Sequence, residues 1–401
     1  MTQDTRGAIG DRPRRTPAVV FLVLLAIRCA VLAHVIVDAT AHPVTDVYVL
    51  RVEQIATSPG TPYRDYPVEY MFPETLAIEL IGGGGAQAAA IWLAVFAFVA
   101  DLAAAAAVWW GWGRRPAAVY LILGTPLLLF LYQRFDLVSV ALAAWGAALL
   151  ARGKDEDGVG GGVAIGAAIM LKLWPLAVAP VVLVRRRWRA LTAIVAVCVA
   201  TLLAWSLVGG PSGPSQVVTF RGARGWSVES IEGDLLWLVS DDPPTMQAGA
   251  MRIGDATGWA KGLLLVGLLA YEVIVWRGAG RRSRDPSGGV TLVAVSAVLV
   301  FSPLISEQYA AWLLPWAAVA FMGDRDERIV AAIATVAIAL TGLLSYFYQS
   351  GFGWATVAER WTILARNAAL VAVLIAWSWI APRTQVAGRD RQVALAPEPS
   401  P

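Results

Sequence analysis

The apolar stretch Val159–Val184, VGGGVAIGAAIMLKLWPLAVAPVVLV, decides how this chain is threaded. Its length suffices for one membrane crossing, which takes about 20 apolar residues in a helix. Basic residues nevertheless flank both ends, with Lys154 before the stretch and the cluster Arg185–Arg189 after it. Because short basic loops remain on the cytoplasmic side of a membrane, a single crossing would leave one of these clusters on the wrong side.

The middle of the same stretch holds Lys172 and Pro175. A charge in the hydrocarbon of a bilayer is costly, and proline removes a backbone donor and breaks a helix. Two short half-helices joined by a turn at Lys172–Pro175 resolve both problems. We therefore expect a re-entrant hairpin that carries Lys172 toward the non-cytoplasmic face. The alternative is one kinked helix from which the Lys172 side chain snorkels to the interface.

The remaining sequence has the composition of a membrane protein. Of 401 residues, 58% are hydrophobic and 15% are charged, whereas soluble domains carry about 25% charged residues. The sequence predicts an all-α polytopic membrane protein with one domain over residues 17–380, built from about ten transmembrane helices and the hairpin. The expected spans are 19–37, 86–110, 117–132, 137–150, 190–208, 259–276, 290–301, 309–321, 329–347 and 361–380.

The distribution of Lys and Arg sets the expected orientation in a bacterial cytoplasmic membrane. Both termini are then cytoplasmic, as tails at residues 1–16 and 381–401, the second of which we expect to be disordered. Two long loops, 38–85 and 209–258, lie on the outer face. The alternative for the N-terminus is a cleaved signal peptide, because Ala39-Thr40-Ala41 resembles a cleavage site. Arg28 interrupts the preceding apolar stretch, which is also long for a signal peptide.

The expected outer segments bring a carboxylate, Asp46, together with two cations, Arg134 and Lys172. A sugar that leaves a lipid phosphate needs a base for the acceptor hydroxyl and cations for the leaving phosphate. No nucleotide-binding motif of the form G-x-G-x-x-G or G-x-x-x-x-G-K-[ST] accompanies them, which argues against a nucleotide-sugar donor. The net charge is only +3 and the basic residues are scattered in short clusters, so nothing suggests binding to nucleic acid.

Simpler interpretations of these residues remain open. Asp46 could be a solvated loop carboxylate, and Arg134 with Asp136 could form a local ion pair, which contributes little when exposed. His42 and Asp46 could share a divalent metal, but two ligands fall short of a site. The sequence therefore supports no cofactor.

Several segments, in order along the chain, resemble those of glycosyltransferase family 87, the polyprenyl-phosphate-mannose-dependent mannosyltransferase-like proteins. The first outer loop carries the strongest likeness, in Asp46-Val47-Tyr48 followed by Pro62–Tyr70. It departs from the family pattern after Glu69-Tyr70, where Met71-Phe72-Pro73 stands in place of a proline pair. The other segments are Lys172–Pro175, similar to a K-x-x-P turn; Arg224–Ser230, similar to R-G-x-x-x-E-S; and Ser302-Pro303 with Trp312–Pro315, similar to late S-P and W-x-x-P segments.

This resemblance implies a GT-C fold and an inverting transfer on the outer face of the membrane. The donor would be a polyprenyl-phosphate sugar, with mannose expected and arabinofuranose or glucose as the next candidates. The acceptor would be a glycolipid or glycan of the cell envelope. By its place in the motif Asp46 is the expected catalytic base, and Lys172, Arg134 and Arg224 are expected to bind the donor phosphate. The residues expected to position the substrate are Tyr63, Asp65, Glu69, Asp136, Glu229 and Glu307.

Two other classes of protein compete with this interpretation. A lipid or solute transporter also carries intramembrane charges and broken helices, although its polar groups should lie near the midplane between pseudo-symmetric halves. A non-catalytic scaffold for envelope assembly would need no set of carboxylates and cations.

Overall fold

The computed structural model describes residues 18–153, 158–219, 225–240, 242–247, 250–283, 285–349 and 357–379. The two expected tails and Arg224 lie outside these residues. Within them, each expected span coincides with one helix or with two or three consecutive helices. These are α1 (Ala18–Ala41), α4 (Ala86–Trp112), α5 (Arg114–Gly124) continued by η1 (Thr125–Leu127) and α6 (Leu128–Leu131), α7 (Asp136–Arg152), α10 (Trp188–Gly209), α13 (Gly258–Arg282), α14 (Gly289–Val300), η3 (Glu307–Leu313) with α15 (Leu314–Ala320), α16 (Arg325–Gln349) and α17 (Val357–Trp379).

The prediction of a polytopic helical membrane protein is confirmed. Seven helical segments of the described chain are long and apolar enough to cross a membrane. The remaining spans are shorter, and α14 shows why that is tolerated. Ten of its twelve residues are buried, so neighbouring helices rather than lipid surround it. In hydrocarbon every backbone polar group must be paired within the structure, which a buried helix satisfies at any length.

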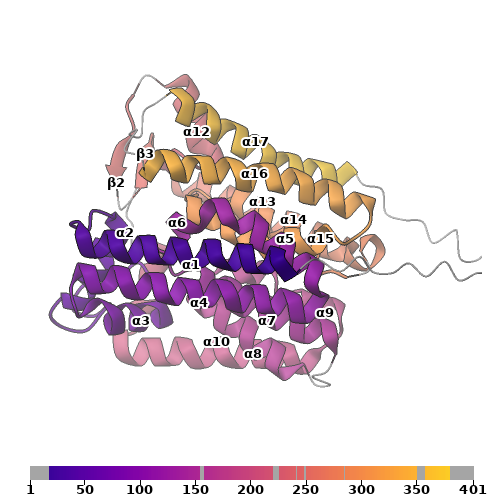
Figure 1. The fold of residues 1–401 in the computed structure, drawn as a ribbon, viewed down its shortest axis with the longest axis horizontal. Coiled ribbons are helices and arrows are strands. Elements are labelled where there is room, and N and C mark those ends of the chain that lie inside the picture. Colours follow the sequence, from indigo (N-terminus) through magenta and orange to yellow (C-terminus); the bar gives the residue numbers. More distant parts are fainter. Residues whose placement is uncertain are drawn as a thin grey trace, which may run out of the picture.

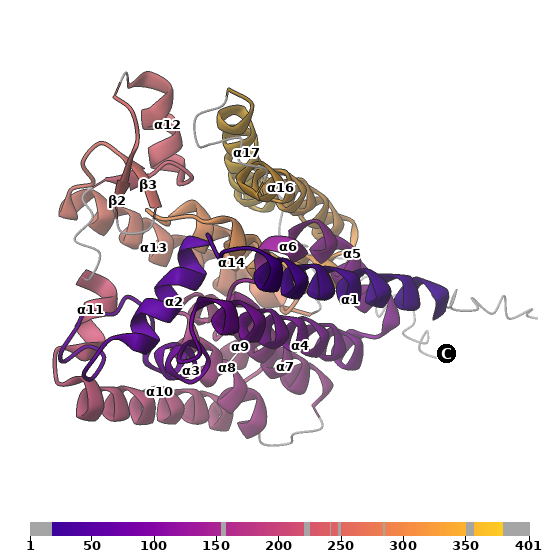
Figure 2. The ribbon, with the colours of Figure 1, turned by 60° about the vertical axis from the view of Figure 1, so that its left-hand side comes forward.

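The helices form two groups (Figures 1 and 2), which meet where α5 packs on α15 and η1 packs on α16. In the first group α1 packs on α4, α4 on α7, and α7 on the hairpin helix α8 (Val159–Leu171), which in turn packs on α10. In the second group α16 pairs with α17, and α14 packs against both α13 and α17. Alanines form most of the buried face of α4, and such small side chains allow membrane helices to approach closely.

The stretch Val159–Val184 forms the expected hairpin rather than one kinked span. Helix α8 ends at Lys172, whose backbone is extended, and η2 (Trp174–Ala177) and α9 (Val181–Val184) return the chain. Gly158 at the start of the hairpin lies against Arg187 at its end, since a Cβ built on Gly158 would stand 3.4 Å from the Arg187 Cβ. Both basic flanks therefore lie at the same end of the bundle.

The two long loops are more ordered than the sequence predicted. The first contains α2 (Val47–Thr57) and α3 (Phe72–Gly82), and the second contains α11 (Gly213–Thr219) and α12 (Ile231–Val239). The second also holds a small antiparallel sheet in the order β1-β3-β2, which the sequence did not predict. Its strands are β1 (Trp226–Ser227), β2 (Thr245–Gln247) and β3 (Ala250–Ile253). We call the end of the bundle that carries α2, α3, α12 and this sheet the loop end (Figure 1).

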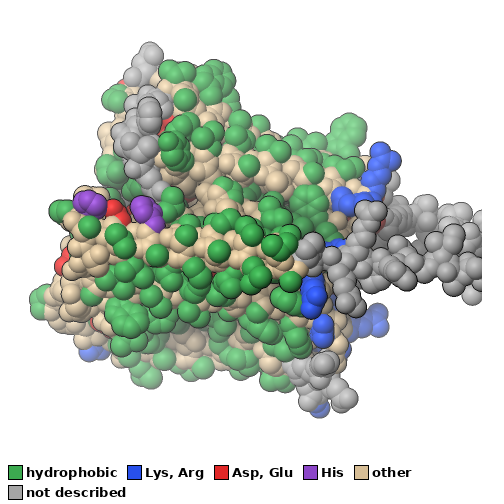
Figure 3. Space-filling model, viewed as in Figure 1, with side chains coloured by type: hydrophobic (Ala, Val, Ile, Leu, Met, Phe, Trp, Pro, Cys, Tyr) green, Lys and Arg blue, Asp and Glu red, His purple; other side chains and the backbone are tan. Residues whose placement is uncertain are grey.

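The surface separates charge from apolar area in the manner of a membrane protein (Figure 3). Apolar side chains cover the flank of the bundle, including Leu203, Leu207 and Val266, which are more than half exposed. On this face Lys and Arg gather at the end opposite the loop end, whereas the histidines and acidic side chains lie at the loop end. The positive-inside rule predicts such a segregation, so the cytoplasmic side is expected at the basic end.

Candidate active site

Asp46 lies where the first long loop begins, and it is held from two directions. As the N-cap of α2, its Oδ1 accepts hydrogen bonds from the backbone N–H groups of Tyr48 at 2.9 Å and Val49 at 3.1 Å. Arg134 adds a fork, with Nη1 at 2.9 Å from Oδ1 and Nη2 at 3.1 Å from Oδ2. The Asp46 side chain keeps 13% of its surface exposed, so the carboxylate remains accessible.

Arg134 occupies the turn between α6 and α7 and is almost buried. The rings of Phe130 and Tyr48 lie against its guanidinium group, with centroids 4.2 and 4.9 Å from Cζ. The alternative of a local ion pair between Arg134 and Asp136 is wrong, because Arg134 pairs with Asp46 and Asp136 faces Lys172. A helix begins at Asp136 and directs the two neighbouring side chains to different partners.

A second ion pair lies next to the first. Lys172 Nζ is 2.9 Å from Oε1 of Glu74, which is buried in the first turn of α3. The Tyr48 hydroxyl donates to the same oxygen at 2.9 Å, so Tyr48 contacts both Asp46 and Glu74. Burial raises the pKa of Glu74, and Asp136 adds to this rise while the Lys172 ammonium opposes it. Glu74 was not predicted as a site residue, although it directly follows Met71-Phe72-Pro73, the segment that departs from the family pattern.

Asp136 joins the hairpin turn to the late W-x-x-P segment. Its Oδ1 accepts a hydrogen bond from Nε1 of Trp312 at 3.0 Å, and Trp312 stacks on Trp174 of the hairpin and on Tyr309. Among the described residues Asp136 Oδ2 has no hydrogen-bond partner and faces Lys172 Nζ at 3.9 Å. Segments that the sequence identified separately thus converge on one buried carboxylate.

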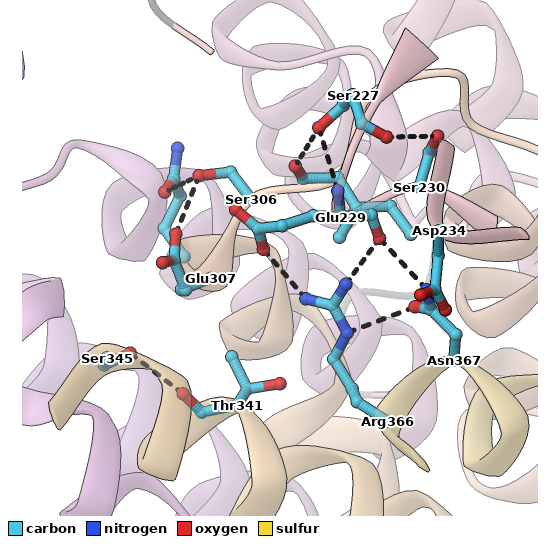
Figure 4. A network of polar contacts seen from close by, with 12 residues as sticks. Ser227, Glu229, Ser230, Asp234, Ser306, Glu307, Thr341, Ser345, Arg366 and Asn367 are labelled. Carbon is cyan, nitrogen blue, oxygen red and sulfur yellow. Dashed lines mark hydrogen bonds and ion pairs between the residues drawn. The ribbon is translucent and has the colours of Figure 1, made fainter. Parts of the chain in front are cut away.

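A third polar cluster lies between α12, α17 and the segment before η3 (Figure 4). Arg366 Nη1 donates to Glu229 Oε2 at 2.9 Å, and Asn367 Nδ2 donates to Asp234 Oδ2 at 3.0 Å. Burial and the nearby Glu307 raise the pKa of Glu229, against the opposing effect of Arg366. Arg366 was not predicted as a site residue, although a charge inside the last apolar span is a usual sign of function.

The other predicted site residues of the first loop make local contacts. The Tyr63 hydroxyl donates to the backbone oxygen of Tyr70, Asp65 accepts from the Thr61 N–H, and Glu69 forms a fork with Arg51. These contacts explain how the loop keeps its shape. Their role in positioning a substrate stays a prediction.

A cavity of about 400 Å³ opens beside Asp46, between the two helix groups. It is lined by His34, Val35, Asp38, Ala39, His42, Pro43, Val44, Thr45, Asp46, Val49, Ala90, Leu129, Gln133 and Tyr348. Figure 3 shows the histidines in the hollow between the two helix groups, beside acidic side chains. Within the described part of the chain, no group of three or more His, Cys, Asp or Glu side chains is arranged to hold a metal ion.

A sequence model of glycosyltransferase family 87 matches residues 83–306, more than half of the chain. The chain belongs to glycosyltransferase family 87. The match covers Arg134, Lys172 and Glu229, whereas Asp46 and Glu74 precede it. This family 87 protein is therefore a multi-pass membrane glycosyltransferase.

Among solved structures, the family 87 protein is similar to the crystal structure of ArnT from Cupriavidus metallidurans bound to undecaprenyl phosphate. The two share 14% identity and a TM-score of 0.44, over 90% of this chain and 77% of the other. These values mark a distant likeness. No curated protein matches the sequence.

Proposed function

We propose that this family 87 protein transfers a sugar, in the first instance mannose, from a polyprenyl-phosphate donor to a hydroxyl of an envelope glycolipid or glycan. Transfer takes place on the outer face of the membrane and inverts the anomeric centre. One observation carries the proposal: the Asp46 carboxylate lines an open cavity while Arg134 fixes its orientation. Membership in the family supports glycosyl transfer, and the resemblance of the first loop supports the lipid-linked donor.

Asp46 acts as the general base of a single displacement. The acceptor hydroxyl oxygen attacks the anomeric carbon and gives its proton to Asp46. The bond between that carbon and the phosphate oxygen breaks, and polyprenyl phosphate leaves with the bonding electrons. A positioned base of this kind contributes about 10²- to 10⁴-fold to a rate, and attack opposite the leaving group inverts the configuration.

Arg134 and Lys172 stabilise the negative charge that grows on the leaving phosphate. Arg presents a planar fork that matches phosphate oxygens, and Lys presents a compact charge. The Lys172 side chain is 19% exposed and the Glu74 side chain only 1%, so Glu74 supports the ammonium from the buried side.

The test is a transfer assay with the purified protein in lipid. Radiolabelled polyprenyl-phosphate mannose, arabinofuranose and glucose are each supplied with an envelope glycolipid extract. We expect label to move into glycolipid from the mannose donor. Label that moves from another of the three corrects the sugar and keeps the reaction class. Failure of all three donors, together with protein-dependent movement of labelled lipid between leaflets, would favour the transporter interpretation.

A further inference from the structure

Three polar side chains lie along one face of α1 and its C-terminal end. His34 and Asp38 are in the helix and His42 directly follows it, each four residues from the next, a spacing that aligns side chains on a helix. His42 Nδ1 lies 3.0 Å from Asp38 Oδ1. Helix α1 ends at Ala41, so His34 lies about 10 Å inside the candidate span at 1.5 Å per residue.

These polar side chains would be unfavourable in lipid, and in the structure they line a cavity instead. Ionisable side chains within membrane spans face the bundle interior or a water-filled cavity and mark substrate paths. Both histidines of the chain and Asp38 line the 400 Å³ cavity beside Asp46. Known ligand pockets occupy about 300–1,000 Å³, so the volume suits a small polar group rather than a lipid chain.

The charge of the lining decides what kind of group fits. Asp38 and Asp46 are both carboxylates, and the described lining residues include no Lys or Arg. Arg134 and Lys172 are not among the lining residues, and their charges are paired with Asp46 and Glu74. Apart from the two histidines, the ionisable groups that a phosphate would meet in this cavity are carboxylates.

Hydroxyl groups match the lining better. Gln133 and Tyr348 can each donate and accept a hydrogen bond, and a carboxylate accepts from hydroxyls. Leu129, which is 37% exposed, supplies apolar surface for a face of a sugar ring. Gln133 directly precedes Arg134, which pairs with Asp46, so the cavity adjoins one of the phosphate-binding candidates.

We propose that this cavity binds the neutral, hydroxyl-bearing end of the acceptor, a sugar or polyol, and presents its hydroxyl to Asp46 from the side of α1. The donor phosphate then approaches from the side of Arg134 and Lys172. The inference rests on the proposed function for the role of the bound group, but binding of a neutral sugar does not depend on turnover.

The first arm of the test measures binding without turnover. Wild-type protein in nanodiscs is examined by saturation-transfer NMR with methyl mannoside, mannose 6-phosphate and glucosamine. We expect a signal from the neutral sugar that Gln133→Leu and His42→Leu each reduce and the matched variant Gln87→Leu leaves unchanged. Gln87 lies exposed at the start of α4. A stronger signal from the phosphorylated or the amino sugar would overturn the proposal.

The second arm measures kinetics. In the transfer assay Gln133→Leu and His42→Leu should raise the acceptor KM about 10-fold, the effect of one lost hydrogen bond, with the donor KM changed less than about 2-fold. A raised donor KM with an unchanged acceptor KM would contradict the cavity assignment. If no donor is turned over but the neutral sugar still binds and the two variants weaken it, the proposed reaction fails while the cavity assignment stands.

Discussion

Arg134 holds Asp46 with both terminal nitrogens of its guanidinium group, at 2.9 and 3.1 Å, although the two residues are 88 positions apart. The contact ties the turn before α7 to the beginning of α2. Aromatic rings of Tyr48 and Phe130 cover the guanidinium group, so its geometry is set before a substrate arrives. The orientation of the carboxylate thus depends on one distant side chain.

Replacement of Arg134 by Lys should keep the charge and remove the fork. Lysine offers a point charge that cannot contact two oxygens in a fixed plane. A lost hydrogen bond to a charged group costs about 1.5–3 kcal/mol, so kcat/KM for the donor should fall about 10- to 100-fold. The control is Arg185→Lys, which changes the 2.7 Å pair with Asp285. A donor kcat/KM that is as low in the control as in Arg134→Lys would contradict a specific role for Arg134.

Variants of the Glu74–Lys172 pair should distinguish an effect on stability from an effect on catalysis. Lys172→Met leaves the buried Glu74 carboxylate without its partner, and breaking a buried pair in this way costs about 3–5 kcal/mol. Thermal unfolding in detergent should show a lower Tm for Lys172→Met and a partial recovery when Glu74→Gln is added. Transfer should stay lost in both variants, because Lys172 is needed for the phosphate. An active double variant would assign Lys172 a structural role alone.

Substitutions in a buried polar network inside the bundle should lower stability without lowering the transfer rate per folded molecule. Arg28 Nε lies 2.7 Å from Asp101 Oδ2, and the Tyr120 and Tyr132 hydroxyls donate to the same carboxylate at 2.8 and 3.2 Å. Asp101→Leu should lower stability by about 3–5 kcal/mol, because Arg28 is left charged and buried. Adding Arg28→Met should restore most of the Tm.

The activity per folded molecule of the Arg28→Met, Asp101→Leu double variant should remain within about 2-fold of wild type, since none of the proposed catalytic groups touches the network. Cys29→Ala, an exposed neighbour on α1, is the control for stability. A double variant that is stable but inactive would place the network among the groups that position Asp46.

Glu229 predicts a pH dependence of stability with a defined sign. Its pKa is raised from the ordinary value of 4.5 to about 8 in the folded protein, first by burial and then by Glu307. Between these two pH values the folded state binds more protons than the unfolded state, so stability falls as pH rises. Glu229→Gln mimics the protonated carboxyl and removes this dependence.

The measurement is Tm against pH for wild type and Glu229→Gln. The two curves should run close together near pH 4.5, and the wild type should lose stability relative to the variant as pH rises toward 8. Curves that keep a constant separation over this range would show that Glu229 does not titrate with a raised pKa.

The sequence predicted the spans and the hairpin because membrane physics leaves few options for them. Lys172 and Pro175 inside an apolar run with basic flanks imply a turn, and the structure has one there. The sheet of the second long loop was not predicted, because its strands have two to four residues and are too short to show an alternating pattern.

The sequence singled out individual residues of the candidate site but not the pairs that they form. Asp46, Arg134 and Lys172 were singled out from charge near the membrane, but the partners Glu74 and Arg366 were not. Pairing depends on how α3 and α17 pack against distant segments, which local sequence does not encode. The Arg134–Asp136 alternative failed for the same reason, since neighbours in sequence point to different sides when a helix starts between them.

The most direct test of the account is the transfer rate of Asp46→Asn with polyprenyl-phosphate mannose as donor. Asparagine can still cap α2 but cannot take a proton from the acceptor. The matched control is Asp324→Asn, because Asp324 caps α16 by accepting two backbone N–H groups in the same way. We predict that Asp46→Asn loses about 10³-fold in kcat per folded molecule, while Asp324→Asn turns over normally. Turnover by Asp46→Asn within a few-fold of wild type would contradict the assignment of Asp46 as the base.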